Sequence, residues 1–362
     1  MQYNVIGLMS GSSLDGLDMA FVHFEENAGQ WTFEILDTYC KPYPPDWKEK
    51  LTGINGLSAK DYLLLHTTYG HWLGNAVNDF MEARDLAYRV QLIASHGHTS
   101  FHEPAKRMTA QLGDGASIAA VTGIRTITDL RSVDLALGGQ GAPIVPIGEK
   151  LLFPDYDLFL NLGGIANISA RGTNRIGFDV CPANRILNLL AAGTEKGYDD
   201  KGLIAAGGNI NENLLDKLNR LDYYKQSYPK SLSNEFGLNE VYPLILQAKL
   251  SMEDALATYV EHITVQISKS LILLKQQFSE KRELNLLITG GGAHNQFLTE
   301  RIKNKVSPAG IQCIIPHESL VDYKEALIIA LMGALRWRED VNVLHTVTGA
   351  SKDSINGAVW SV

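Results

Sequence analysis

Cysteine is scarce in this chain of 362 residues, and its three copies, Cys40, Cys181 and Cys313, lie far apart with no C-x-x-C pair. That spacing excludes a disulfide framework and gives no sign of a structural zinc site. Lys and Arg total 32 against 40 Asp and Glu, which leaves a formal net charge of −8. Because nucleic acids and anionic membranes are bound by basic surfaces, the composition argues against both classes of partner.

Long hydrophobic runs are also missing, since the longest apolar stretch, residues 326–335, is well short of the roughly 18 residues that mark a membrane span. The N-terminus lacks the basic region and cleavage site of a signal peptide, so we expect a cytoplasmic protein. The P-loop, the Rossmann glycine fingerprint, the HExxH zinc helix and the GxSxG elbow are absent as well. A hydrophobic content of 45% and this length fit a well-packed protein of two domains.

What the chain does contain is glycine-rich turns between apolar strands. The first lies within residues 5–22, where backbone N–H groups and hydroxyls suit a phosphate. Its candidate nucleotide-binding residues are Gly11, Ser12, Ser13, Leu14, Asp15, Gly16, Leu17 and Asp18. Carboxylates beside a polyphosphate repel it unless a cation lies between them, so Asp15 and Asp18 indicate Mg²⁺ held through water. A plain β-hairpin is the alternative interpretation.

The second half opens in the same way, with a hairpin over residues 156–169 and Gly163 and Gly164 in its turn. Two such hairpins indicate a duplicated domain with a nucleotide between the copies, by analogy with the actin, hexokinase and Hsp70 superfamily. We therefore predict an α/β fold of two actin-like (ribonuclease H-like) domains with an inter-domain nucleotide cleft. The predicted domains are residues 1–128 and 129–362, with a hinge near residues 125–135.

A third glycine cluster, Gly290, Gly291 and Gly292, follows the predicted strand 284–289 and precedes a helix. Three consecutive glycines let a phosphate or a flat ring approach the backbone closely. A tight turn between strand and helix is the alternative, but such a turn needs fewer glycines.

Polar residues gather where predicted strands end. His96 and His98 follow the strand 90–94, at the edge where open α/β sheets bind ligands. Turn histidines bonded to the backbone are the other interpretation. Asp179 follows the strand 174–178 and is the best candidate for the single carboxylate that phosphoryl transfer needs, although it could instead cap the helix that follows. Glu325, near the start of an apolar helix, is either a first-turn charge or a site group.

Taken together, these segments resemble those of the anhydro-N-acetylmuramic acid kinases, a bacterial sugar-kinase family. The matching segments are GLMSGSSLDGLD from Gly7, SHGHT from Ser95, QLGDGASIA from Gln111, DLRSVDLALGGQGAPIVP from Asp129, NLGGIANIS from Asn161, GFDVCPAN from Gly177, TGGGAHN from Thr289 and KEAL from Lys324. The resemblance implies a reaction that opens the 1,6-anhydro ring with water and phosphorylates O6 from ATP. The product would be N-acetylmuramic acid 6-phosphate, and relatives of this kind are expected to form dimers.

The resemblance also implies roles for residues. The three glycine loops would bind ATP and Mg²⁺, Asp179 would be the general base, and Glu325 would support it. Sugar contacts would come from His96, His98, Thr99, Gln111, Arg131, Asp134 and Asn184.

Two departures from the family pattern lie on the substrate side. Val180 and Cys181 precede Pro182 where the family has Thr-Gly-Pro, and His98 stands where Gln is usual. A kinase of another 1,6-anhydro sugar, such as levoglucosan, and a non-catalytic actin-like nucleotide switch are therefore kept as alternatives.

Overall fold

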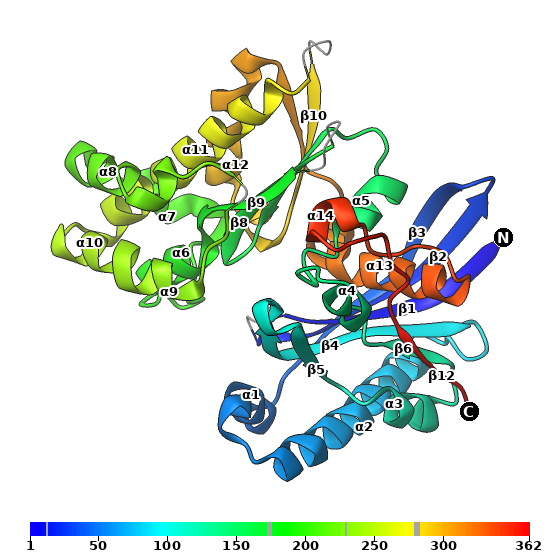
Figure 1. Cartoon of the computed structure of the whole chain (residues 1–362). Coiled ribbons are helices and arrows are strands. Elements are labelled where there is room, and N and C mark those ends of the chain that lie inside the picture. The colour runs from blue at the N-terminus through cyan, green and yellow to red at the C-terminus, as the bar shows by residue number, and fades with distance from the viewer. Residues whose placement is uncertain (12–13, 172–175, 229, 279–282) are drawn as a thin grey trace. The chain divides into compact units, whose positions relative to one another are not determined.

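The computed structural model divides into two compact units, which are described here one at a time (Figure 1). The structure describes residues 1–11, 14–171, 176–228, 230–278 and 283–362. The first unit is Met1–Pro154 with Tyr323–Val362, and the second is Asp155–Asp322.

The first unit is built on a seven-stranded sheet with the order β12-β6-β4-β1-β2-β3, in which β5 also pairs with β4. Its strands are β1 (Gln2–Ser10), β2 (Gly16–Asn27), β3 (Gln30–Pro42), β4 (Leu92–Glu103), β5 (Met108–Leu112), β6 (Thr126–Thr128) and β12 (Ala358–Trp360). Its helices are α1 (Pro45–Thr52), α2 (Ala59–Ala83), α3 (Gly115–Thr122), α4 (Ser132–Ala136), α5 (Pro146–Leu152), most of α13 (Glu318–Trp337) and α14 (His345–Thr348).

The second unit is built on a five-stranded sheet with the order β11-β10-β7-β8-β9. Its strands are β7 (Leu158–Leu162), β8 (Ile165–Ala170), β9 (Ile176–Pro182), β10 (Leu284–Thr289) and β11 (Ile311–Ile314). Its helices are α6 (Asn184–Leu190), α7 (Leu203–Gly207), α8 (Glu212–Asn219), α9 (Asn234–Phe236), α10 (Tyr242–Gln247), α11 (Met252–Lys275) and α12 (Gln296–Val306).

The two sheets share one topology. In each, three antiparallel strands in sequence are followed by a fourth that pairs in parallel with the first, as β4 does with β1 and β10 does with β7. A later strand then pairs in parallel with the fourth, as β6 does with β4 and β11 does with β10. This repetition confirms the duplicated α/β fold that the two hairpins predict.

Alternation along β1 explains why helices cover both faces of the first sheet. Ile6 and Leu8 are fully buried in one core cluster with residues of α2, whose N-terminus is capped by the Ser58 side chain. Gly7 points to the other face, where a Cβ would overlap the Ala326 carbonyl of α13. The absence of a side chain at Gly7 lets α13 lie directly on the strand.

The second unit has its own hydrophobic core. Residues of α11 belong to one buried cluster with strand β7, whose Leu158, Leu160 and Leu162 are all fully buried. Every member of this cluster lies between Leu158 and Val321. The unit therefore has an apolar interior that uses no residue of the first unit.

The division of the chain differs from the predicted boundary at residues 128 and 129. The chain passes between the units at Pro154 and Asp155 and again at Asp322 and Tyr323, whereas the predicted hinge region forms β6 and α4 inside the first unit. Asp134 holds α4 there, because its N–H donates to Asn356 and its carboxylate accepts from the Thr348 hydroxyl, both in the C-terminal segment. No helix in the described ranges has the length and apolar character needed to cross a bilayer.

Candidate active site

The first glycine turn connects β1 and β2. The Leu14 N–H donates to the Gly11 carbonyl over 3.4 Å, and Leu14 has a φ of +57°, a conformation that only a few non-glycine residues adopt. Ser12 and Ser13, both predicted nucleotide contacts, lie outside the described residues.

The residues after this turn differ in what they can contact. Asp15 is exposed and Asp18 is half-buried, which suits an ion held through water, because Mg²⁺ keeps several waters and needs only one or two carboxylates. Leu17 is only 1% exposed, in the core, and a Cβ on Gly16 would meet the Cys40 sulfur at 2.6 Å. Contrary to prediction, the Leu17 side chain serves packing, and Gly16 lacks a side chain where one would overlap Cys40 and Lys41.

A chain of buried hydroxyl groups connects β1 with the predicted sugar residue His98. The Tyr43 hydroxyl donates to Ser10 Oγ over 2.7 Å and lies 2.5 Å from the Tyr69 hydroxyl, while Ser10 Oγ is 2.9 Å from His98 Nδ1. Ser10 Oγ, which accepts from Tyr43, can use its own proton to donate to Nδ1, and in that arrangement His98 carries its proton on Nε2. Burial lowers the pKa of His98, so the ring is neutral and presents one N–H donor.

His96 and Arg131 form a second buried pair in the first unit. Nδ1–H of His96 donates to the Gly97 carbonyl over 2.9 Å, and the Arg131 Nε–H donates to His96 Nε2 over 3.0 Å. Burial and the charge of Arg131 lower the pKa of His96 to about 3. His96 therefore orients the guanidinium group, whose terminal N–H groups have no partner in the described part of the chain.

Desolvation shifts the pKa values of both Glu325 and Arg131, and the attraction between their charges opposes both shifts. Burial lowers the pKa of Arg131 to about 10, against the pull of the Glu325 carboxylate. The Glu325 side chain reaches solvent, but the protein packed around it raises its pKa while Lys324 and Arg131 oppose the rise. Lys324 itself is buried, 3.8 Å from Glu149. Glu325 thus has two cationic neighbours, Lys324 and Arg131, and its role as a site group stays a prediction.

Asp134 was predicted to contact the sugar, but the structure gives it a different task. Its side chain is 0% exposed, and it accepts hydrogen bonds from the Gly141 N–H over 2.7 Å and the Thr348 hydroxyl over 2.6 Å. Both carboxylate oxygens are therefore used inside the protein. Asp134 holds the glycine loop of residues 138–141 to the C-terminal segment.

Thr99 and Gln111 face each other across β4 and β5, a hairpin that was not predicted. Thr99 is exposed, and Gln111 Nε2 donates to Thr109 Oγ1 over 2.7 Å. A pocket of about 320 Å³ opens beside this hairpin, and both His96 and Gln111 line it. A sugar can therefore reach these two side chains from within the first unit.

The two glycine loops of the second unit lie side by side. The Asn184 side chain donates to the Leu162 carbonyl over 2.9 Å, and a Cβ on Gly292 would meet Leu162 Cβ at 2.7 Å and Asn184 Oδ1 at 2.8 Å. The N–H groups of residues 183–185 donate to the carbonyls of Gly163 and Gly164. Asn184 thus connects the loops predicted to bind nucleotide, although the prediction placed it with the sugar.

Asp179 lies on β9 beside a break in the regular pairing with β8. One carboxylate oxygen accepts the Leu232 N–H over 2.9 Å, and the side chain is half-buried. Helix α6 has no side-chain cap, so the interpretation of Asp179 as a cap is wrong. Burial raises the pKa of Asp179 against the effect of the Leu232 N–H, which makes its carboxylate a stronger base than an exposed Asp.

Sequence reasoning missed the residues that hold these groups in place. Ser10 and Tyr69 stand in apolar strand and helix patterns, and Tyr43 lies in the connection between β3 and α1. None of these settings gives a sign of a shared hydrogen-bond chain. Thr348 and Asn356 contact Asp134 from more than 200 positions away in the chain. These five residues are recognised by being both polar and buried, and their burial is known only from the folded structure.

The whole chain is similar to one family of known proteins. The model of the family described as anhydro-N-acetylmuramic acid kinase matches residues 3–362. Relatives with that name include proteins of Vibrio vulnificus strain CMCP6, 32% identical over 98% of both chains, and Aliivibrio fischeri, 34% identical over 98% of both. A relative from Coxiella burnetii, strain Dugway 5J108-111, is 34% identical over 98% of this chain and 96% of its own.

Solved structures are similar at a lower level. The activator of the 2-hydroxyisocaproyl-CoA dehydratase from Clostridium difficile matches with a TM-score of 0.42 and 16% identity, covering 94% of this chain and 96% of that one. A ROK family glucokinase from Streptomyces griseus matches with a TM-score of 0.40 and 12% identity, over 91% and 99%. Likeness at this level says nothing about ligands. The family match and the full-length relatives are decisive, and the chain belongs to the anhydro-N-acetylmuramic acid kinase family.

Proposed function

We propose that this chain uses ATP to convert anhydro-N-acetylmuramic acid into N-acetylmuramic acid 6-phosphate, with hydrolytic opening of the 1,6-anhydro ring. Family membership supports a kinase for this sugar. The observation that carries the chemical step is Asp179, a half-buried carboxylate in the middle of β9, with a raised pKa and, among the described residues, one hydrogen bond, from the Leu232 N–H, that holds its direction.

In the proposed reaction Asp179 takes a proton from water as the water oxygen bonds to C1 of the sugar. The bond between C1 and the bridging O6 breaks at the same time, and its electron pair leaves with O6. The O6 atom then attacks the γ-phosphorus of ATP, and ADP departs. One base serves ring opening, and the nucleophile for phosphoryl transfer is produced by that same step.

The first unit would supply the groups that orient the sugar. Arg131, fixed by His96, would offer its terminal N–H groups to hydroxyl or carboxylate oxygens. With Ser10 donating to its Nδ1, His98 would offer an Nε2–H donor. Glu325 would accept from a sugar hydroxyl and support the charge balance with Arg131. Arg131 and His98 are each held by a hydrogen bond within the first unit, to His96 and Ser10 respectively.

The glycine loops would bind the nucleotide. Gly11 at the first turn and the paired loops around Gly164 and Gly291 present backbone with little side chain in the way. Charge neutralisation on the phosphates would come from Mg²⁺, held through water by Asp15 and Asp18. A cytoplasmic location and a homodimer stay predictions.

A coupled ADP assay over a panel of sugars tests the proposal. We expect ADP release with anhydro-N-acetylmuramic acid to exceed that with levoglucosan, and Asp179→Asn to lower turnover by roughly 10²–10⁴-fold with ATP affinity nearly unchanged. The acid limb of the rate should lie above the ordinary range of an Asp, because the rate needs the ionised carboxylate and its pKa is raised. Asp216→Asn, which alters an exposed ion pair with Arg220, serves as the control.

Two results would favour other functions. Faster turnover of levoglucosan would indicate a kinase of another 1,6-anhydro sugar, which the Val180, Cys181 and His98 departures keep open. ATP hydrolysis that no sugar accelerates would indicate a nucleotide switch. Sugar-dependent ADP release that survives Asp179→Asn would remove Asp179 as the base.

A further inference from the structure

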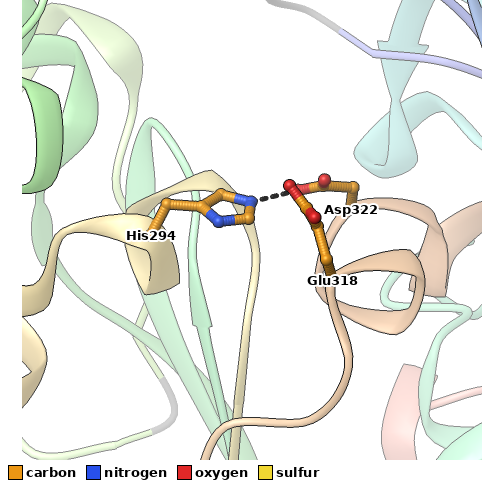
Figure 2. A group of neighbouring side chains, drawn as sticks. All are labelled: His294, Glu318 and Asp322. Atoms are coloured by element: carbon orange, nitrogen blue, oxygen red, sulfur yellow. Dashed lines mark hydrogen bonds and ion pairs between the residues drawn. The ribbon is translucent and has the colours of Figure 1, made fainter.

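Three side chains with metal-binding atoms converge on the surface of the second unit. His294, Glu318 and Asp322 each place one ligand atom within 4.8 Å of the other two, and His294 Nε2 is 2.6 Å from Asp322 Oδ1. Figure 2 shows the imidazole and both carboxylates pointing toward one another from two separate elements. All three side chains are exposed, so an ion in solution can reach them.

The backbone that carries these side chains is already connected. His294 ends the short 3₁₀ helix Gly291–His294, and Glu318 and Asp322 lie one turn apart at the start of α13. The Gly290 N–H donates to the Val321 carbonyl over 3.1 Å, which joins the glycine loop directly to that turn of α13. Ligands on elements held together in this way lose little freedom when an ion binds.

The local charge favours a cation. Glu318 and Asp322 are like charges four residues apart on one helix, an arrangement that repels. No Lys or Arg of the described residues forms an ion pair with either carboxylate, and Asp322 has His294 alone as its partner. A bound cation would neutralise both carboxylates.

The mixture of ligands selects the kind of ion. One imidazole nitrogen with two carboxylate oxygens suits Zn²⁺, Ni²⁺ or Co²⁺, whereas Mg²⁺ prefers oxygen ligands and retained water. Metal–ligand distances of about 2.0–2.2 Å bring the three ligand atoms closer to one another than the 4.8 Å within which they now lie. Rotation of the exposed side chains supplies that change. We propose that His294, Glu318 and Asp322 form a binding site for a divalent transition-metal ion of the Zn²⁺ class. The ion replaces the His294–Asp322 hydrogen bond and cross-links the Gly290–Gly292 loop to α13.

Calorimetric titration of the full chain, purified without a histidine tag and treated with chelator, tests this site with Zn²⁺. We expect one site per chain and an affinity at least tenfold weaker in both His294→Ala and Glu318→Gln. Zn²⁺ should also raise the midpoint of thermal unfolding of the unaltered chain but not that of the two variants. No nucleotide or sugar is present, so the result does not depend on the proposed kinase activity.

The chain offers a matched control. His345 and Asp353 form an exposed pair at the same 2.6 Å, with side-chain exposures of 46% and 42% against 45% and 36% for His294 and Asp322. In the described residues this control pair has no third metal-ligating partner. His345→Ala should therefore leave Zn²⁺ binding unchanged. Absent binding, or equal binding by all three variants, would overturn the proposal.

Discussion

Buried histidines near the predicted sugar residues are neutral because the protein around them disfavours their charged form. Burial lowers the pKa of His98 and, with Arg131, lowers that of His96 to about 3. In the unfolded chain the same rings take a proton near the ordinary value of 6.5. The contribution of these histidines to the free energy of unfolding is therefore fully present above that pH and is lost as the pH falls toward their folded-state pKa values. The loss is up to about 1.4 kcal/mol per pH unit for each histidine.

Replacing His98 should weaken this pH dependence. In His98→Gln the amide oxygen can still accept from Ser10, but no proton is taken up on unfolding. We expect the free energy of unfolding to fall less between pH 7 and pH 5 than in the unaltered chain, as measured by guanidinium titration. His71→Gln, at an exposed position, should behave as the unaltered chain does, and equal slopes for all three proteins would contradict the assigned burial of His98.

At the scale of residues, the sequence indicated which side chains carry reactive groups better than it indicated which of them are buried. Asp179 was expected just after a strand, whereas β9 runs through it from Ile176 to Pro182, and its role as the base stays a prediction. Asp134 and Leu17 were misassigned because both lie in glycine-rich motifs, and only the fold shows that one is enclosed by the Gly141 N–H and Thr348 and the other by the core. Neighbours that are distant in sequence decide such cases.

Among the structural elements, the glycine turns separate into those that need glycine for packing and those that have free space. Gly290 has a φ of +83°, and a Cβ there would lie 3.0 Å from the Leu162 carbonyl. A Cβ on Gly164 would meet nothing closer than Arg185 Cβ at 3.8 Å. Gly290 thus packs closely against β7, whereas Gly164 has open space beside its backbone.

This difference gives a paired prediction. Gly290→Ala should destabilise the protein by about 1–3 kcal/mol, because it combines a strained backbone with overpacking. Gly164→Ala should change stability by less than about 0.5 kcal/mol but weaken ATP binding, because the added methyl group occupies space that a phosphate would use. Thermal unfolding and titration with ATP measure the two effects. A Gly164→Ala protein with unchanged ATP affinity would remove this loop from the nucleotide site.

Long periodic elements were predictable, and short or paired ones were not. Apolar residues recur three and four positions apart between residues 58 and 83, a spacing that predicts the helix observed there as α2 with its Ser58 cap, and the predicted strand 284–289 is β10. Strand β5 was missed because the apolar and polar alternation of residues 108–112 spans only five residues, and pairing with β4 decides their conformation. The small residues that follow Gln111 favour a helix from sequence alone, whereas α3 begins only at Gly115, after the Asp114 cap.

At the scale of the whole molecule, the second unit is continuous in sequence, whereas the first is assembled from two separated segments. The core cluster of the second unit includes no residue outside 158–321, and that of the first unit's α2 face includes none beyond Ile124. The predicted boundary at residue 128 was wrong in detail because glycine content marks a loop but does not tell which core the following residues join.

We expect residues 155–322 to fold when expressed alone. The fragment keeps its five strands and its apolar interior, so it should unfold in one cooperative transition, measured by circular dichroism in guanidinium. Leu256→Ala, at a fully buried position of α11, should lower its stability by about 2–5 kcal/mol. A fragment without cooperative unfolding would show that the second unit depends on the first.

The close approach of α13 to β1 at Gly7 also constrains the order of events during synthesis. The strand that bears Gly7 leaves the ribosome early, but the helix that covers its second face emerges only after every residue of the inserted unit has been made. That strand must therefore wait with a bare apolar surface, including Val5, while the later portion of the polypeptide completes its own fold. During translation, the nascent first half is the segment with the greatest need of a chaperone.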